Sequence, residues 1–243
     1  MLAGKKTIIF DLDGTIVDTN GMWAYIDCEI IKRLSSKIED PRFISRLMFE
    51  FFSSNNEGDS FKRYYDYLRV IYDLNVSDVN EVLELKDKLF GIYCKEKIKL
   101  KDGVLDFIIF LKDNGFKIGI ATTSDSNTVN NYFDSELIIR ELRQRNLMCS
   151  FSDLFDIILT SDDVKFTKPN PEIYLKVISL FGVRNQDCLV FEDSMIGVKA
   201  AKGALIDVCS VYDEWINQDE IKDIVDYSIS SYFDFGVKKL IKR

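Results

Sequence analysis

The chain of 243 residues is 47% hydrophobic and 30% charged, a composition typical of a globular protein with enough residues for a buried core. Its formal net charge of −8 argues against nucleic acid and anionic membrane surfaces as main partners, and no apolar run approaches the roughly 20 residues of a membrane span. The chain has no histidine, which excludes Ser-His-Asp and Cys-His nucleophile systems and His-ligated zinc sites.

The first predicted element is a strand, and a series of helices follows it. Residues 6–10 form a short apolar run, typical of a buried strand, that leads directly into Asp11 and Asp13. From about residue 18 to residue 99, apolar residues recur at helical spacing in four stripes, and the polar segment 53–60 separates the second stripe from the third. Four amphipathic helices with no strand between them predict a small helical bundle.

After about residue 100, predicted helices and strands alternate. Helices are expected over 103–115, 127–149, 170–182 and 194–204. Asn170 is the expected N-cap of the third helix, with Pro171 in its first turn, and Ser194 is the expected N-cap of the fourth. Strands are expected over 116–124, 155–160, 187–193, 205–211 and 226–230. This alternation predicts an α/β fold in which helices cover both faces of a parallel sheet. We therefore expect a discontinuous core of residues 1–17 and 100–243, interrupted by a helical domain of residues 18–99.

Polar residues follow several of these strands at the point where each strand ends. Ligands of such sheets bind beyond the carboxyl ends of the strands, so we expect these residues to meet at one edge of the sheet. They are Asp11, Asp13, Thr122, Thr123, Ser124, Lys168, Glu192 and Asp193.

The acids in this set would repel one another unless a cation lay among them. Oxygen ligands without histidine or thiolate suit Mg²⁺. Thr122 could donate a hydrogen bond to a phosphate oxygen, and Lys168 could neutralise charge beside it. One carboxylate can accept a phosphoryl group, while a second protonates the leaving alcohol and then takes a proton from water. The set therefore favours phosphoryl transfer at a magnesium site.

Each of these residues also has a simpler interpretation. Asp11 and Asp13 alone would suit an acidic turn, and Glu192 with Asp193 would suit negative charge at a helix N-terminus. Ser124 is expected to pack or to cap a helix rather than to act in catalysis. The occurrence of all these residues at one predicted edge favours the functional interpretation.

Four segments of the chain resemble the four motifs of the haloacid dehalogenase-like (HAD) superfamily, in order and at fitting spacing. They are "DLDGT" (11–15), "ATTS" (121–124), "KPNPEIY" (168–174) and "FEDSMIGVKAA" (191–201). The resemblance extends over nearly the whole chain and equates the helical insert with the cap domain of that family. It implies a Rossmann-like core and the phosphatase and β-phosphoglucomutase-like subgroup, because Asp13 would serve an alcohol leaving group.

The resemblance also implies a role for each site residue. Asp11 would be the nucleophile that forms an aspartyl phosphate, and Asp13 would be the general acid and base. Thr122, with Thr123 beside it, and Lys168 would bind the phosphoryl group. The ligands of Mg²⁺ would be Asp11, Asp193 and the backbone carbonyl of Asp13, with Glu192 acting through water or as a support.

Three features depart from the family pattern. Asp102-Gly103 stands where Pro-Gly is frequent, and Leu205 occupies a position where glycine is frequent. The stretch from 125 to 167 is longer than the resemblance leads us to expect, which indicates a longer helix or a local flap.

We therefore expect a Mg²⁺-dependent phosphatase that hydrolyses a small phosphate monoester. A β-phosphoglucomutase-like phosphotransferase shares the core motifs, but that group relies on a histidine of the cap, which this chain lacks. A non-catalytic binding protein of the same fold is the alternative from another class. The expected partner is a small phosphorylated metabolite, with no role for nucleic acid or membrane. The five scattered cysteines show no CxxC spacing, which favours reduced thiols in a cytoplasmic protein.

Overall fold

The computed structural model describes residues 1–54, 60–216, 219 and 221–235. The chain divides into two compact units, residues 1–20 with 95–243 and residues 21–94. The first is an α/β unit, and the second is the inserted helical cap. The predicted polar break at 53–60 falls partly on residues 55–59, which lie outside the described residues.

The helical unit confirms the four predicted helices. They are α1 (Met22–Ser35), α2 (Pro41–Ser54), α3 (Ser60–Tyr72) and α4 (Val79–Lys97), the last of which ends within the α/β unit. The apolar stripes form the interior of the bundle, where Ile26, Ile30, Ile44 and Leu68 are buried. The side chain of Asp40 accepts a hydrogen bond from the backbone N–H of Arg42, which accounts for the start of α2 at Pro41.

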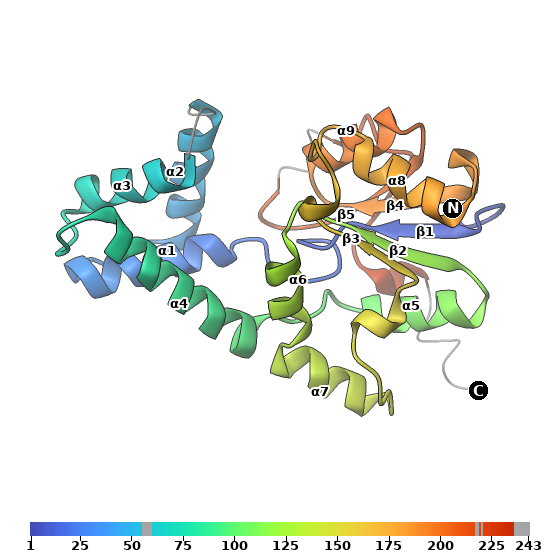
Figure 1. The fold of residues 1–243 in the computed structure, drawn as a ribbon, viewed down its shortest axis with the longest axis horizontal. Helices are drawn as coiled ribbons and strands as arrows, with labels where there is room; N and C mark the ends of the chain where they lie inside the picture. Colours follow the sequence, from blue (N-terminus) through green and yellow to red (C-terminus); the bar gives the residue numbers. More distant parts are fainter. Residues whose placement is uncertain (55–59, 217–218, 220, 236–243) are drawn as a thin grey trace. The chain divides into compact units, whose positions relative to one another are not determined.

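The α/β unit contains a six-stranded, all-parallel sheet with the strand order β3-β2-β1-β4-β5-β6 (Figure 1). The strands are β1 (Thr7–Phe10), β2 (Lys117–Ala121), β3 (Ile157–Leu159), β4 (Cys188–Glu192), β5 (Asp207–Val211) and β6 (Tyr227–Ile229). The helices are α5 (Val104–Asp113), α6 (Ser126–Phe133), α7 (Glu136–Gln144), α8 (Glu172–Phe181) and α9 (Met195–Gly203). The predicted α/β class, parallel sheet and helical insert are therefore confirmed.

Helices cover both faces of the sheet, as Figure 1 shows for α5 on one side and α8 with α9 on the other. The side chains of successive residues in β1 point to opposite faces of the sheet. Ile9 packs into an apolar cluster that includes residues of α8 and α9. Phe10 points the other way and contacts the rings of Phe107 in α5 and Tyr232 near the C-terminus. β1 is fully buried between these layers. Because β1 lies between β2 and β4 in the strand order, its carboxyl end is near the middle of the edge where the strands end.

Two local predictions were wrong. The single helix expected over 127–149 is two helices, α6 and α7, because the hydroxyl of Ser135 caps α7 and also donates to the backbone carbonyl of Ile98. The third predicted helix begins one residue later than expected, with Pro171 rather than Asn170 at the N-cap position. The Asn170 side chain still accepts a hydrogen bond from the N–H of Glu172. The N-cap predicted at Ser194 is confirmed, since its hydroxyl accepts from the N–H of Gly197.

Among the described residues, no helix has the length and apolar character needed to cross a membrane.

Candidate active site

The carboxyl ends of β1, β2 and β4 bring together side chains from three distant parts of the sequence. Asp11 follows β1, which lies between β2 and β4, and its N–H donates to the carbonyl of Phe191 in β4. Thr122 follows β2 and is fully buried, and Glu192 ends β4, immediately before Asp193. The sequence-based expectation that these residues share one edge therefore agrees with the topology of the sheet.

Lys168 lies among these acids. Its Nζ is 2.6 Å from Asp11 Oδ1 and 2.6 Å from Glu192 Oε1, and all three side chains are buried. Burial by itself lowers the pKa of Lys168, but the adjacent carboxylates outweigh it and raise the pKa well above its usual value. Lys168 therefore stays positively charged and neutralises part of the negative charge of the site.

Asp11, Glu192 and Asp193 form a buried acidic cluster in which one carboxylate oxygen of each lies within 4.8 Å of the others. Burial, and then the charge of Glu192, raise the pKa of Asp11, and the same two causes raise the pKa of Asp193 to about 7. Asn20 Nδ2 donates to Asp193 Oδ2 at 2.6 Å.

The charge of this cluster fits a divalent cation. Three carboxylates face a single ammonium group, that of Lys168, so negative charge is in excess in a buried site. Burial is the main cause of the raised pKa values of Asp11 and Asp193, and the neighbouring charge of Glu192 adds to it. An all-oxygen ligand set is the kind that Mg²⁺ prefers. Three of the predicted metal ligands have their carboxylates close together in the structure: Asp11, Glu192 and Asp193.

The carboxylate of Asp13 is held by hydroxyl groups. Thr19 Oγ1 donates to Asp13 Oδ1 at 3.1 Å, and Ser124 Oγ donates to Asp13 Oδ2 at 2.7 Å. Thr122 Oγ1 lies 3.4 Å from the same Oδ2 atom. Asp13 is therefore anchored at the edge of the site that contains Thr122, one of the predicted phosphate-binding residues. Thr123 is exposed beside Thr122.

Thr19 was not predicted at the site, and Ser124 was expected at this edge without a part in catalysis. Ser124 contacts Asp13 directly, although the sequence indicated only packing or capping. The available signal was its place at the end of a strand in the predicted ligand-binding edge. Thr19 reaches Asp13 because the chain turns back at Gly14, whose N–H donates to Thr19 Oγ1. That contact depends on the shape of the loop and has no pattern in the sequence.

Gly14 permits this close approach of loop and acid. Its φ of +71° lies in the left-handed region, and a Cβ atom there would be 2.1 Å from Asn20 Nδ2 and 2.2 Å from Asp193 Oδ2. Any larger residue would therefore displace Asp193 or the side chain that holds it.

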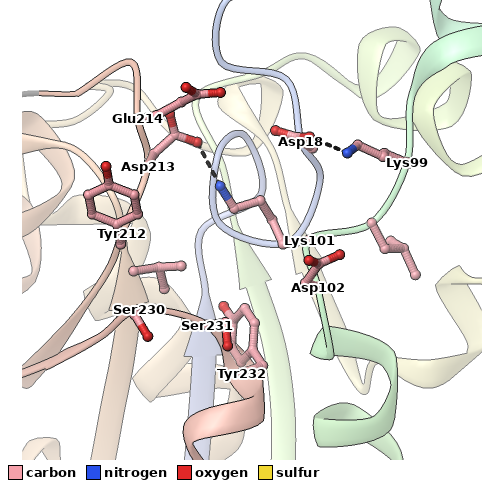
Figure 2. Close-up of a pocket in the computed structure, with 12 residues that line it drawn as sticks. Asp18, Lys99, Lys101, Asp102, Tyr212, Asp213, Glu214, Ser230, Ser231 and Tyr232 are labelled. Carbon is pink, nitrogen blue, oxygen red and sulfur yellow. Dashed lines mark hydrogen bonds and ion pairs between the residues drawn. The ribbon is translucent and has the colours of Figure 1, made fainter.

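A polar cavity of about 390 Å³ lies between the end of β5 and the segment that follows α4 (Figure 2). Both of its lysines are paired with carboxylates, Lys101 with Asp213 at 2.6 Å and Lys99 with Asp18 at 3.1 Å. The lining also includes Asp102 and Glu214, and its acids outnumber its lysines. This cavity is therefore poorly suited to an anion.

Comparison with known proteins agrees with this geometry. The family model for haloacid dehalogenase-like hydrolases matches residues 5–204. The chain belongs to this family. As a HAD hydrolase it is an enzyme of the phosphatase type, which confirms the resemblance that the four sequence motifs indicated.

Two relatives and one solved structure illustrate the similarity. YhcW of Bacillus subtilis is 32% identical over 199 residues, which cover 82% of this chain and 80% of that protein. The Thermotoga maritima enzyme named phosphorylated carbohydrates phosphatase is 27% identical over 202 residues, 83% of this chain and 82% of its own. The crystal structure of CbbY from Rhodobacter sphaeroides in complex with phosphate has a TM-score of 0.67 at 21% identity, and the alignment covers 96% of each chain. That last similarity supports the fold of this HAD hydrolase.

Proposed function

We propose that this HAD hydrolase is a Mg²⁺-dependent phosphatase that cleaves a small phosphate monoester through an aspartyl phosphate on Asp11. The observation that supports the proposal best is the contact of Lys168 with both Asp11 and Glu192, beside Asp193. A buried nucleophilic carboxylate next to a buried ammonium group can receive a phosphoryl group whose negative charge the ammonium neutralises.

The proposed reaction has two steps. In the first, an oxygen of Asp11 attacks phosphorus, the bond from phosphorus to the alcohol oxygen breaks, and the carboxyl of Asp13 gives its proton to the leaving alcohol. In the second, Asp13 takes a proton from water, and that water displaces the carboxylate of Asp11 to release inorganic phosphate. Thr122 and Lys168 bind the phosphoryl oxygens in both steps.

A bound Mg²⁺ would neutralise phosphoryl charge in this site. The residues that would hold it are Asp11, Asp193 and the backbone carbonyl of Asp13, with Glu192 acting through water or as a support. The excess of buried negative charge in the acidic cluster supports this assignment.

The relatives suggest the substrate class. The name of the Thermotoga maritima relative specifies phosphorylated carbohydrates, and a second relative of comparable length is named hexitol phosphatase B of Escherichia coli. We propose a phosphorylated sugar or sugar alcohol as the substrate of this chain.

A panel of sugar and polyol phosphates, assayed for inorganic phosphate with Mg²⁺ and with EDTA, tests the proposal. Asp11→Asn should abolish turnover and leave the fold intact, because the amide has the same shape but cannot accept the phosphoryl group. Asp73→Asn, the same change at an exposed position of the cap, is the matched control and should retain activity. Turnover by Asp11→Asn would refute the assignment.

Two further outcomes would favour the alternatives. Conversion of glucose 1-phosphate into a sugar-phosphate isomer, without free phosphate, would indicate a phosphomutase. Failure of the wild type to release phosphate from every member of the panel would indicate a non-catalytic binding protein.

A further inference from the structure

Tyr174, in the first turn of α8, contacts two of the charged groups at the site. Its hydroxyl donates to Glu192 Oε1 at 2.7 Å, and the same oxygen accepts from Lys168 Nζ at 2.6 Å. The ring of Tyr174 lies beneath the ammonium group of Lys168, with Nζ 5.0 Å from the ring centroid. Tyr174 therefore contacts both Lys168 and Glu192, which are hydrogen-bonded to each other.

Apolar packing accounts for an aromatic ring at position 174, but it does not account for the hydroxyl group that distinguishes tyrosine from phenylalanine. The side chain is fully buried in the apolar cluster between the sheet, α8 and α9. A phenylalanine would fill that space equally well. A hydroxyl buried in apolar surroundings costs free energy unless it finds a partner, and the partner here is Glu192.

The position of Glu192 depends on contacts at both of its oxygens. Oε1 accepts from Tyr174 and Lys168, and Oε2 accepts from the hydroxyl of Ser194 at 3.1 Å. Gly197 closes one side, because even a Cβ atom there would overlap the carboxylate of Glu192. Loss of the tyrosine hydroxyl would leave Lys168 as the donor to Oε1 among the described contacts and would free the carboxylate to turn towards Ser194.

We propose that Tyr174 is a positioning residue for the reaction. It holds Glu192 through its hydroxyl, Glu192 holds Lys168, and Lys168 is thereby kept against Asp11, where the phosphoryl group would be transferred. This inference rests on the proposed phosphatase function. It assigns a role to the hydroxyl of the tyrosine that ends "KPNPEIY" (168–174).

The decisive variant is Tyr174→Phe, which keeps the ring beneath Lys168 and removes only the hydroxyl. We expect kcat to fall about tenfold while KM changes less than threefold, because Lys168 would still attract the phosphate but no longer align it with Asp11. Inhibition by orthovanadate, which imitates the five-coordinate phosphorus of the transition state, should weaken by a similar factor. In the crystal structure of the variant, Lys168 Nζ should move out of hydrogen-bond distance of Asp11 Oδ1.

Tyr64→Phe is the matched control. Tyr64 is a buried tyrosine of the cap whose hydroxyl donates to the carboxylate of Asp27 at 2.8 Å. Its loss should lower thermal stability but leave kcat of the folded enzyme within about twofold of wild type. A merely structural role for Tyr174 would give the same pattern as this control.

Each outcome decides the proposal. An unchanged kcat in Tyr174→Phe, or a Lys168 that stays in place in its crystal structure, would overturn it. If the wild type releases no phosphate from any monoester, the proposed function fails, and the displacement of Lys168 in the crystal structure still decides whether Tyr174 positions it.

Discussion

Lys168 Nζ lies 2.6 Å from Asp11 Oδ1, although 157 positions separate the two residues in the sequence. Both side chains are buried, at 2% and 9% exposure. A buried ion pair adds little net stability by itself, but removal of one partner leaves a desolvated charge and is strongly destabilising. Here the lysine contacts two carboxylates, those of Asp11 and Glu192, beside a third, that of Asp193, so its removal should increase the excess of negative charge in the cluster.

Lys168→Met should lower the unfolding free energy by about 3–5 kcal/mol in EDTA. Added Mg²⁺ should restore part of this loss, because a bound cation would replace some of the missing positive charge. Activity should fall by about 10²–10³-fold, the range for loss of one charge-stabilising group. Urea denaturation with EDTA and with Mg²⁺ measures the first two effects.

Lys202→Met is the control for this prediction. Lys202 pairs with Asp226 at a partly exposed position, where an ion pair contributes little. An equal response of the two variants to Mg²⁺ would contradict the assignment of the acidic cluster as the metal site.

Two glycines of α9 give a matched test of how tightly Glu192 is held. A Cβ atom at Gly197 would lie 1.7 Å from Glu192 Oε1, whereas one at Gly203 would meet Pro171 Cβ at 3.4 Å, an ordinary contact. Gly197→Ala should therefore displace Glu192 and reduce kcat by about 100-fold, the cost of a misplacement of about 1 Å. Gly203→Ala should keep its activity and gain up to about 1 kcal/mol of stability. Equal kcat values for the two variants would show that the position of Glu192 does not matter for turnover.

The edge of the sheet that holds the site could be predicted from the sequence. In a parallel sheet every strand ends at the same edge, so polar residues after apolar runs must meet there once the class of fold is recognised. Asp11, Thr122 and Glu192 follow this rule directly, because each lies at or just after the end of its strand. Lys168 lies several residues beyond its strand, so its place at this edge follows less directly from the rule, and the family resemblance adds to it.

Contacts that depend on non-local geometry could not be predicted. The break between α6 and α7 is stabilised by a bond from Ser135 to the carbonyl of Ile98, far away in sequence. Ser124 was expected only to pack or to cap a helix, and Tyr174 was given no role, so only the distances to Asp13 and Glu192 reveal these contacts. Periodicity identifies which face of an element is buried, but not which polar atom lies across from it.

Leu205 is a departure from the family pattern with a measurable consequence. It follows α9 with a φ of +58°, while Leu205 N–H bonds to the Lys202 carbonyl and Ile206 N–H to the Ala201 carbonyl. This is the helix-ending motif in which glycine is favoured, because a Cβ atom is strained there. Leu205 is 78% exposed, so little buried area would be lost on substitution.

Leu205→Gly should therefore stabilise the protein by about 0.5–1 kcal/mol in urea denaturation, since relief of strain exceeds the added freedom of the unfolded chain. Leu205→Ala retains the strained Cβ atom and should give no such gain. Equal stability of the two variants would mean that the left-handed conformation carries no cost at this position.

Asp27, in α1, gives the cap a pH-dependent stability. The side chain is fully buried, and burial raises its pKa from 3.8 to about 7, despite hydrogen bonds from Tyr64 and Tyr65 that lower it. Between about pH 4 and pH 7, the Asp27 carboxyl is therefore protonated in the folded state but ionised in the unfolded state. Stability must fall as the pH rises through this window and then level off above it.

The difference in unfolding free energy between wild type and Asp27→Asn isolates this effect, because the other titrating groups are common to both proteins. Wild type should lose on the order of 2–4 kcal/mol relative to the variant between pH 4 and pH 7.5, from a shift of about three pKa units. Urea denaturation at a series of pH values measures the difference. A difference that stays constant with pH would mean that Asp27 is ionised in the folded cap at all these values, with its charge compensated by the hydroxyls around it.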